Sequence, residues 1–350
     1  MRQALDDLVV IDRSHSVAGE YCARLMADYG AEVWLDESAG PSPTAAMGPF
    51  DPGGRSLTHL HLNRGKRLGA ASRPADVVLC GPDERPEDVR AADPKVVAVR
   101  ITAFGDDGPK ADWTAPEIVL QAASGMMISN GVRGREPLYG VGERASYAAG
   151  QAAYIQTLVS LRARRRTGTG DTVRIDAAET AATMCFPYVL QAIYNGTDRR
   201  RGDQDIPAGL VRCRGSWVCL WVYSNRFAAL CRTYDIEHCI TDPRFAEVTD
   251  RVRHWPQFFS ILEERVADRD PDAVVAELQA IAIIAARAFT VREIRASHHL
   301  AERGFWQELT IAGQTYVMPR APFLMSRTPA RTPAQSTAGA HAGEFDHAAS

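Results

Sequence analysis

The chain has no apolar run that reaches the roughly 18 residues of a membrane-spanning helix. Its first residues, MRQALDDL, carry acids where a secretion signal would have an apolar core. It also has little net charge, because 40 Lys and Arg residues nearly balance 43 Asp and Glu residues. Nucleic-acid binders usually show a basic excess. We therefore expect a cytoplasmic protein with neither a membrane nor a nucleic acid as its partner.

Cysteine is present but follows no ligand or disulfide pattern. The seven cysteines are an odd number, and no two of them form a C-x-x-C motif. This argues against a disulfide framework and against a zinc site. His59 and His61 alternate on a segment predicted as a strand, but two histidines without a third ligand do not make a metal site. We expect reduced cysteines and no bound metal.

The sequence does contain enough apolar residues for a large core. Of its 350 residues 45% are hydrophobic, which is sufficient for two domains. The last segment, residues 326–350, is rich in Ala, Thr, Pro, Gly and Ser and has little to bury. We expect this tail to be disordered.

The N-terminal residues predict a strand, a helix and a second strand. Residues 8–12 are a short apolar run, residues 17–29 place apolar side chains on one helical face, and residues 32–35 are apolar again. Gly30 suits the position just after a helix. A helix that links two strands of one sheet usually makes them parallel. The order therefore predicts a parallel α/β sheet, which the apolar residues 75–79 extend.

A second regular pattern covers residues 146–179. Apolar residues at helical spacing run from Ala149 to Leu161, and a basic turn precedes Gly168 and Gly170. Basic residues followed by glycine favour the end of a helix. Residues 171–175 then alternate like a strand, and residues 176–179 begin another helix.

Together these segments resemble the class III CoA-transferase family, which includes formyl-CoA and carnitine CoA-transferases and α-methylacyl-CoA racemase. The likeness covers most of the chain. It rests on Ala18-Gly19 and the D-x-G-A-x-V run at 28–33, LNRGKR at 62–67, DPKVVAVRITAFGDDGP at 93–109, EIVLQAASG at 117–125, RRRTGTG at 164–170 and HHLAERGFWQEL at 298–309.

The resemblance implies a fold and an assembly. It predicts a Rossmann-like large domain over residues 1–195 together with residues near 310–325. It also predicts a smaller α/β domain over residues 205–310. Family members form interlocked dimers, so we expect a dimer here.

The family's catalytic residue is missing. In the family an aspartate lies four residues before the glycine that matches Gly150, and residue 146 of this chain is a serine. An aspartate forms a mixed anhydride that can pass an acyl group on, whereas an acylated serine is an ordinary ester and its formation needs a base. We interpret Ser146 first as a residue that caps the helix or lines the site, and only second as a nucleophile.

Two acids could replace the aspartate. Glu143, three residues upstream, could reach the vacated space, or it could be a solvated loop acid. Glu117 stands where the racemases have the aspartate of a His-Asp pair, but Pro116 precedes it, so two-base proton exchange is not expected. Glu117 could instead line the acyl pocket, or favour the start of a helix through its charge.

The resemblance also implies residues for coenzyme A, as a thioester substrate or ligand. Asn63, Lys66 and Arg67 match the family's turn near the CoA nucleotide, where cationic groups can hold phosphate; a solvated basic loop is the alternative. His15 follows the first strand, at an end of a parallel sheet where ligands gather. Val17 stands where the transferases often carry glutamine.

The sequence thus predicts a CoA-transferase-like protein that handles a CoA thioester, with acyl transfer altered or lost because the nucleophile is absent. Two alternatives stay open. The chain could be a non-catalytic subunit that pairs with an aspartate-bearing homologue instead of a second copy of itself. The scaffold could also serve isomerase, lyase or hydrolase chemistry, or bind a ligand without catalysis.

Overall fold

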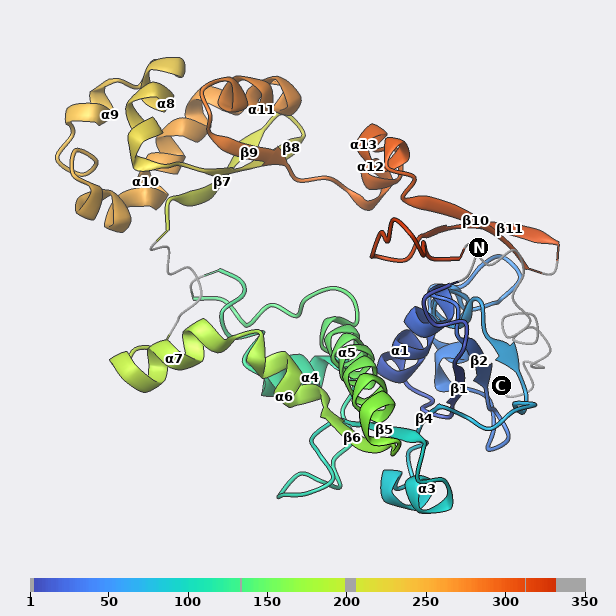
Figure 1. The fold of residues 1–350 in the computed structure, drawn as a ribbon. Helices are drawn as coiled ribbons and strands as arrows, with labels where there is room; N and C mark the ends of the chain where they lie inside the picture. The colour runs from blue at the N-terminus through green and yellow to red at the C-terminus, as the bar shows by residue number, and fades with distance from the viewer. Residues whose placement is uncertain (1–2, 133, 199–205, 312, 332–350) are drawn as a thin grey trace, which may run out of the picture. The chain divides into compact units, whose positions relative to one another are not determined.

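The computed structural model describes residues 3–132, 134–198, 206–311 and 313–331 (Figure 1). These residues divide into two compact units, one made of residues 3–198 and 304–331 and the other of residues 206–303. Residues 332–350 of the predicted disordered tail lie outside the described residues. The start of that tail is placed, because the backbone N–H of Arg331 donates to the carbonyl of Asp28 at 2.7 Å.

A parallel sheet lies at the centre of the first unit. Its strand order over the described residues is β3-β2-β1-β4-β5-β6, and every neighbouring pair is parallel. This is the order of a Rossmann fold, and it confirms the predicted α/β class. The strands are β1 (Val9–Asp12), β2 (Glu32–Leu35), β3 (Arg67–Leu68), β4 (Val77–Leu79), β5 (Val97–Thr102) and β6 (Asp171–Asp176).

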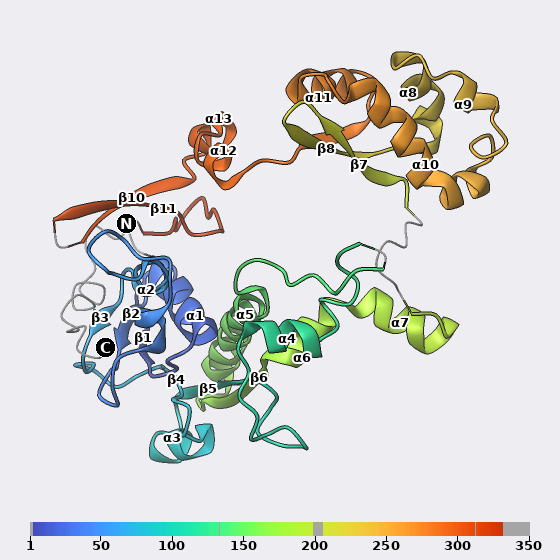
Figure 2. The same cartoon turned by 180° about the vertical axis from the view of Figure 1, so that it is seen from behind.

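Helices pack on both faces of this sheet, because alternate strand residues point to opposite sides. Val10 and Val99 join the core under α1 (Val17–Asp28) and α5 (Arg144–Thr167). Val78 and Ala98 face the other way and pack with α3 (Pro86–Ala92). Figure 2 shows α4 and α6 beside α5. The other elements of this part are η1 (Pro43–Ala46), α2 (Leu57–Asn63), α4 (Glu117–Ala123), α6 (Ala177–Thr183) and α7 (Phe186–Asn195).

The first turns of α1 and α5 are held close together at Gly150. A Cβ atom on this residue would lie 2.5 Å from the carbonyl oxygen of Ala18 and 3.1 Å from Cδ1 of Tyr21. Only glycine allows this approach. The contact places Ser146, one turn earlier on α5, near the start of α1.

His59 and His61 lie in helix α2, so the strand predicted for them is wrong. The side chain of Ser56 accepts a hydrogen bond from the backbone N–H of His59 and caps this helix. Such a cap favours a helix more strongly than a short alternation of residue types favours a strand.

The chain returns to the first unit after Gly304. An antiparallel hairpin, β10 (Trp306–Ile311) and β11 (Gln314–Pro319), packs its buried face against Leu60. The hydroxyl of Tyr316 donates to Asp51 at 2.6 Å, and that of Tyr29 donates to the carbonyl of Phe323 at 2.9 Å. These contacts anchor the returning segment.

The second unit has its own hydrophobic core. An antiparallel sheet, ordered β7-β8-β9, packs with its helices around Phe258. Across both units, the described residues contain no helix that is both long and apolar enough to cross a membrane. The elements are β7 (Ala208–Cys213), β8 (Ser216–Trp221), η2 (Ser224–Arg226), α8 (Phe227–Thr233), α9 (His238–Thr241), α10 (Val248–Val266), α11 (Pro271–Ala280), β9 (Ile284–Arg287), α12 (Val291–Arg295) and α13 (His298–Glu302).

Candidate active site

A cavity of about 540 Å³ lies where the first turns of α1, α4 and α5 meet the end of β5. It brings together four residues that the sequence singled out from three separate segments: Val17, Glu117, Glu143 and Ser146. The sequence motifs placed each of them near the start of a helix. The close packing of α1 against α5 brings those helix starts together.

Glu117 caps the start of α5 from a different helix. Its carboxylate accepts the backbone N–H of Ala145 at 2.7 Å and that of Ser146 at 3.1 Å. The Ser146 hydroxyl donates to it at 2.7 Å, and the Gln121 side-chain amide donates at 2.8 Å. The carboxylate is buried, and the positive end of a 24-residue helix favours its charge. Sequence reasoning missed this pairing, because 29 residues separate the two partners and no motif links them.

Glu143 lines the same cavity, but its carboxylate does not cap a helix. It occupies the N-cap position of α5, yet its side chain makes no capping hydrogen bond. Burial raises the pKa of the Glu143 carboxyl above its ordinary value, and the nearby Glu117 carboxylate raises it further. The pKa of the Tyr139 phenol on the same wall is also raised, mainly by burial. The two glutamates therefore differ. The Glu117 carboxylate accepts four hydrogen bonds, whereas Glu143 lines the cavity without a capping hydrogen bond.

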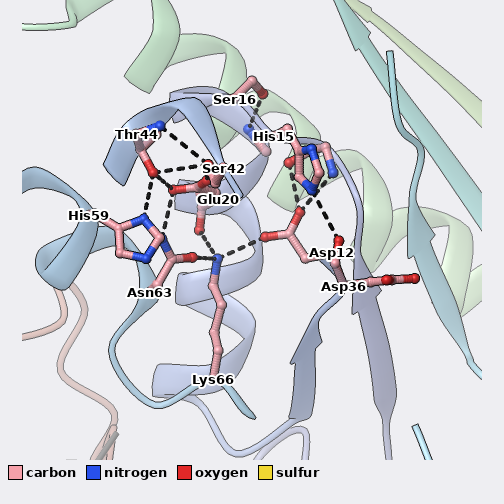
Figure 3. A network of polar contacts seen from close by, with 12 residues as sticks. Asp12, His15, Ser16, Glu20, Asp36, Ser42, Thr44, His59, Asn63 and Lys66 are labelled. Atoms are coloured by element: carbon pink, nitrogen blue, oxygen red, sulfur yellow. Dashed lines mark hydrogen bonds and ion pairs between the residues drawn. The ribbon is translucent and has the colours of Figure 1, made fainter. Parts of the chain in front are cut away.

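A second cavity, of about 820 Å³, extends from the carboxyl ends of β1, β2 and β4 along α3 to Ala75, before β4, and Val96, before β5. His15 lines it, in the loop between β1 and α1, and the next residue, Ser16, lines the first cavity. The two cavities therefore lie on either side of this loop. His15 adopts a φ of 46°, which is rare for residues other than glycine. Its Nε2 atom lies 3.0 Å from the carbonyl oxygen of Asp36 (Figure 3).

Charges on the wall of this second cavity pair with each other. The Arg13 guanidinium forms ion pairs with Asp36 at 3.0 Å and with Glu84 at 2.7 Å. Arg85 adds a second cation to the wall, and Asp83, Asp88 and Asp93 add further acids. An anionic ligand here would have to compete with these carboxylates for Arg13.

Lys66 and Asn63 lie inside the protein and line neither cavity (Figure 3). The Lys66 ammonium donates to Asp12 at 2.8 Å, to the Asn63 side-chain oxygen at 2.7 Å and to the Glu20 carbonyl at 3.0 Å. The Asn63 amide donates to the Glu20 carboxylate at 2.8 Å. These two side chains could reach a phosphate only by breaking this network.

Arg67 differs from its neighbours in the LNRGKR turn. Its side chain is exposed, stacks over the Trp34 ring and pairs with Glu32 at 3.0 Å. It does not line either of the two cavities. The basic turn is therefore divided between buried and exposed cations, which a sequence pattern does not distinguish.

The sequence model of CoA-transferase family III matches residues 5–70 and 83–342 of this chain. Succinyl-CoA–D-citramalate CoA-transferase of Chloroflexus aurantiacus is 26% identical over 85% of this chain and 82% of its own length. A probable fatty acyl-CoA transferase of Mycobacterium tuberculosis is 24% identical over 91% of both chains. A CAIB/BAIF family protein from Brucella suis has a similar fold, with a TM-score of 0.84, 24% identity and 96% coverage of both chains.

Proposed function

Because this chain belongs to CoA-transferase family III, we propose that it binds an acyl-CoA thioester and that acyl transfer through residue 146 is lost. One observation supports the loss of acyl transfer through residue 146. The Ser146 hydroxyl and its backbone N–H both donate to the Glu117 carboxylate, at 2.7 and 3.1 Å. No carboxylate is available at this position to form an acyl anhydride.

We propose that the CoA thioester extends over both cavities. Ligands of parallel α/β sheets bind at the carboxyl ends of the strands, so the nucleotide end belongs in the cavity lined by Arg13 and His15. The pantetheine arm would cross the loop between β1 and α1. The thioester would then lie beside Ser146 and Glu143. The adjacency of the two cavities at this loop supports the arrangement.

The Glu117 carboxylate already has a structural role, because it caps the start of α5 through the backbone N–H groups of Ala145 and Ser146. It accepts four hydrogen bonds, three of them from groups other than the Ser146 hydroxyl. Ser146 therefore lines the cavity and holds the Glu117 carboxylate, rather than attacking a thioester.

Glu143 is the carboxylate in this cavity that could still react. Its oxygens would attack the thioester carbonyl, the carbon–sulfur bond would break, and CoA would leave as a thiolate. The product on the protein would be a mixed anhydride, as a carboxylate nucleophile requires. Any residual acyl transfer by this chain should therefore depend on Glu143 and not on Ser146.

The test combines binding with trapping. CoA and acyl-CoA should raise the melting temperature of the protein, since both bind the folded state. Incubation with acyl-CoA donors and acid acceptors, followed by hydroxylamine or borohydride, should trap no adduct at residue 146. Ser146→Ala should leave whatever transfer is found unchanged, and Glu143→Gln should abolish it.

Ser146→Asp and Ser146→Asn form a matched pair, alike in size and different in charge. The aspartate variant should gain a trappable adduct at residue 146, and the asparagine variant should not. Transfer by the native protein at a rate on the order of 1 s⁻¹ that disappears in Ser146→Ala would refute the proposal.

A further inference from the structure

The cavity of about 540 Å³ that Ser146 lines is called the Ser146 cavity below. The charged side chains on its wall are all acidic among the described residues. Among the described residues that line it, Glu117 and Glu143 are the charged ones, and none is a lysine, an arginine or a histidine. The nearby Arg144 is not part of the lining, and its guanidinium donates instead to the carbonyl of Val141 at 3.2 Å. Most of the remaining wall is aliphatic, including Val17, Met47, Ile101, Ile118 and Leu120.

The two glutamates affect a ligand differently, because only one of them is compensated. Two backbone N–H groups, a hydroxyl and an amide surround the Glu117 carboxylate. The described residues place no hydrogen-bond donor and no cation on the Glu143 side chain. Glu143 therefore presents an uncompensated negative charge to whatever occupies the cavity.

We propose that this cavity takes acyl groups with an uncharged aliphatic end, that it rejects acyl groups carrying a second carboxylate, and that Glu143 sets this preference. The inference rests on the proposed function, since it assumes that the acyl end of the thioester lies here. A second carboxylate would leave water and approach Glu143, and the described residues that line the cavity include no cation to offset the repulsion. Like charges a few ångströms apart repel each other more strongly when little water lies between them, because the screening of their charges is weaker.

Butyryl-CoA and succinyl-CoA provide the sharpest test. Both carry a four-carbon acyl group, and they differ in that one ends in a methyl group and the other in a carboxylate. Calorimetric titration of the native protein should show butyryl-CoA binding on the order of tenfold more tightly or better. Free CoA provides the reference for the contribution of the nucleotide end.

Three variants locate the cause of the preference. Glu143→Gln removes the charge and keeps the shape, so the affinity ratio should fall to within about threefold. Glu143→Asp keeps the charge and should keep the preference. Glu308→Gln removes an exposed glutamate from β10 of the same unit, outside both cavities, and should leave the ratio unchanged.

The outcomes separate this inference from the proposed function. Equal or tighter binding of succinyl-CoA to the native protein would overturn the inference while leaving the CoA site in place. An unchanged ratio in a folded Glu143→Gln protein would show that Glu143 is not the cause. If none of the three CoA compounds binds at millimolar concentration, the proposed function itself is wrong.

Discussion

Serine at position 146 affects the electrostatics of the cavity through its contact with Glu117. A carboxylate at this residue would lie beside Glu117, and two adjacent carboxylates repel each other. The serine hydroxyl donates a hydrogen bond to Glu117 instead, at 2.7 Å. The serine therefore supports Glu117 as the cap of α5, and Glu143 is the acid of the cavity that has no donor among the described lining residues.

Lys66 and Arg67 are adjacent in the sequence and should respond very differently to mutation. Lys66→Met would leave the buried Asp12 carboxylate with its two hydrogen bonds from Ser14 but without its cation, and removing one partner of a buried ion pair costs about 3–5 kcal/mol of unfolding free energy. Arg67→Ala removes an exposed side chain and should change stability by less than about 0.5 kcal/mol. Urea denaturation of both variants measures the difference.

A double variant tests whether the loss of stability comes from leaving Asp12 without its cation. Removing both charges, in Lys66→Met with Asp12→Asn, should recover part of the loss because no unpaired charge remains. A Lys66→Met protein that keeps its full stability but no longer binds CoA would contradict the structural role. It would restore Lys66 as a ligand-binding residue.

At the scale of elements, Tyr316 is one of the polar anchors of the returning hairpin β10–β11, beside the hydrogen bond from Arg64 to the carbonyl of Pro319. The Tyr316 hydroxyl donates to the Asp51 carboxylate at 2.6 Å, and Arg55 pairs with the same carboxylate at 3.0 Å. The hydrogen bond from Tyr316 is the main cause that lowers the pKa of Asp51 to about 2, and the Arg55 backbone and side chain add to it. The contact joins the C-terminal segment to the loop before α2.

This anchor predicts how the hairpin responds to acid. The folded-state pKa of Asp51 is about 2 and its ordinary value is 3.8, so its contribution is present above about pH 4 and is lost as the pH falls toward 2. Tyr316→Phe should therefore destabilise the protein at neutral pH by about 1–3 kcal/mol and matter less near pH 2. Urea denaturation at both pH values measures this.

Hydrogen exchange can also locate the part of the chain that Tyr316→Phe destabilises. Amide hydrogen exchange in Tyr316→Phe should speed up first in β10 and β11. Thr310→Val removes an exposed hydroxyl pair with Thr315 on the same hairpin and serves as the control, with little effect expected. An equal loss of stability in Tyr316→Phe at both pH values would show that the Asp51 charge is not involved.

At the scale of the whole molecule, the described chain exposes many large apolar side chains. They are found in both units, and several of them lie on α7 and α5. Large exposed apolar patches are typical of interaction surfaces. The exposed residues on these two helices include Tyr188, Val189, Leu190, Ile193, Tyr194, Ile155 and Val159.

We expect a second copy of the chain to cover this surface, as the dimers of the family would imply. Light scattering should give about twice the chain mass of 38.3 kDa, and the melting temperature should rise with protein concentration. Ile193→Glu should weaken the assembly, and Glu308→Gln should not. A well-folded monomer would contradict the prediction. Material that becomes soluble only with an aspartate-bearing homologue would favour a mixed pair.

The sequence by itself determined the elements that depend on neighbouring residues. Short apolar runs predicted β1, β2 and β4, alternation predicted β6, and helical spacing predicted α1 and α5, because these patterns are local to a few residues. Gly168 ends α5 with a φ of 77°, as its place after a basic turn indicates. Gly150 marked the position of residue 146, although the reason, its contact with Ala18, is visible only in the structure.

Only the tertiary structure decided which side chains meet. The basic turn at 62–67 reads the same whether its cations are buried or exposed, and the burial of Lys66 depends on Asp12, 54 residues away. Glu117 and Glu143 are both acids near helix starts in the sequence. Folding gives one of them four donors and leaves the other facing a cavity. Local spacing cannot encode this difference, because it depends on how α4 and α5 pack together.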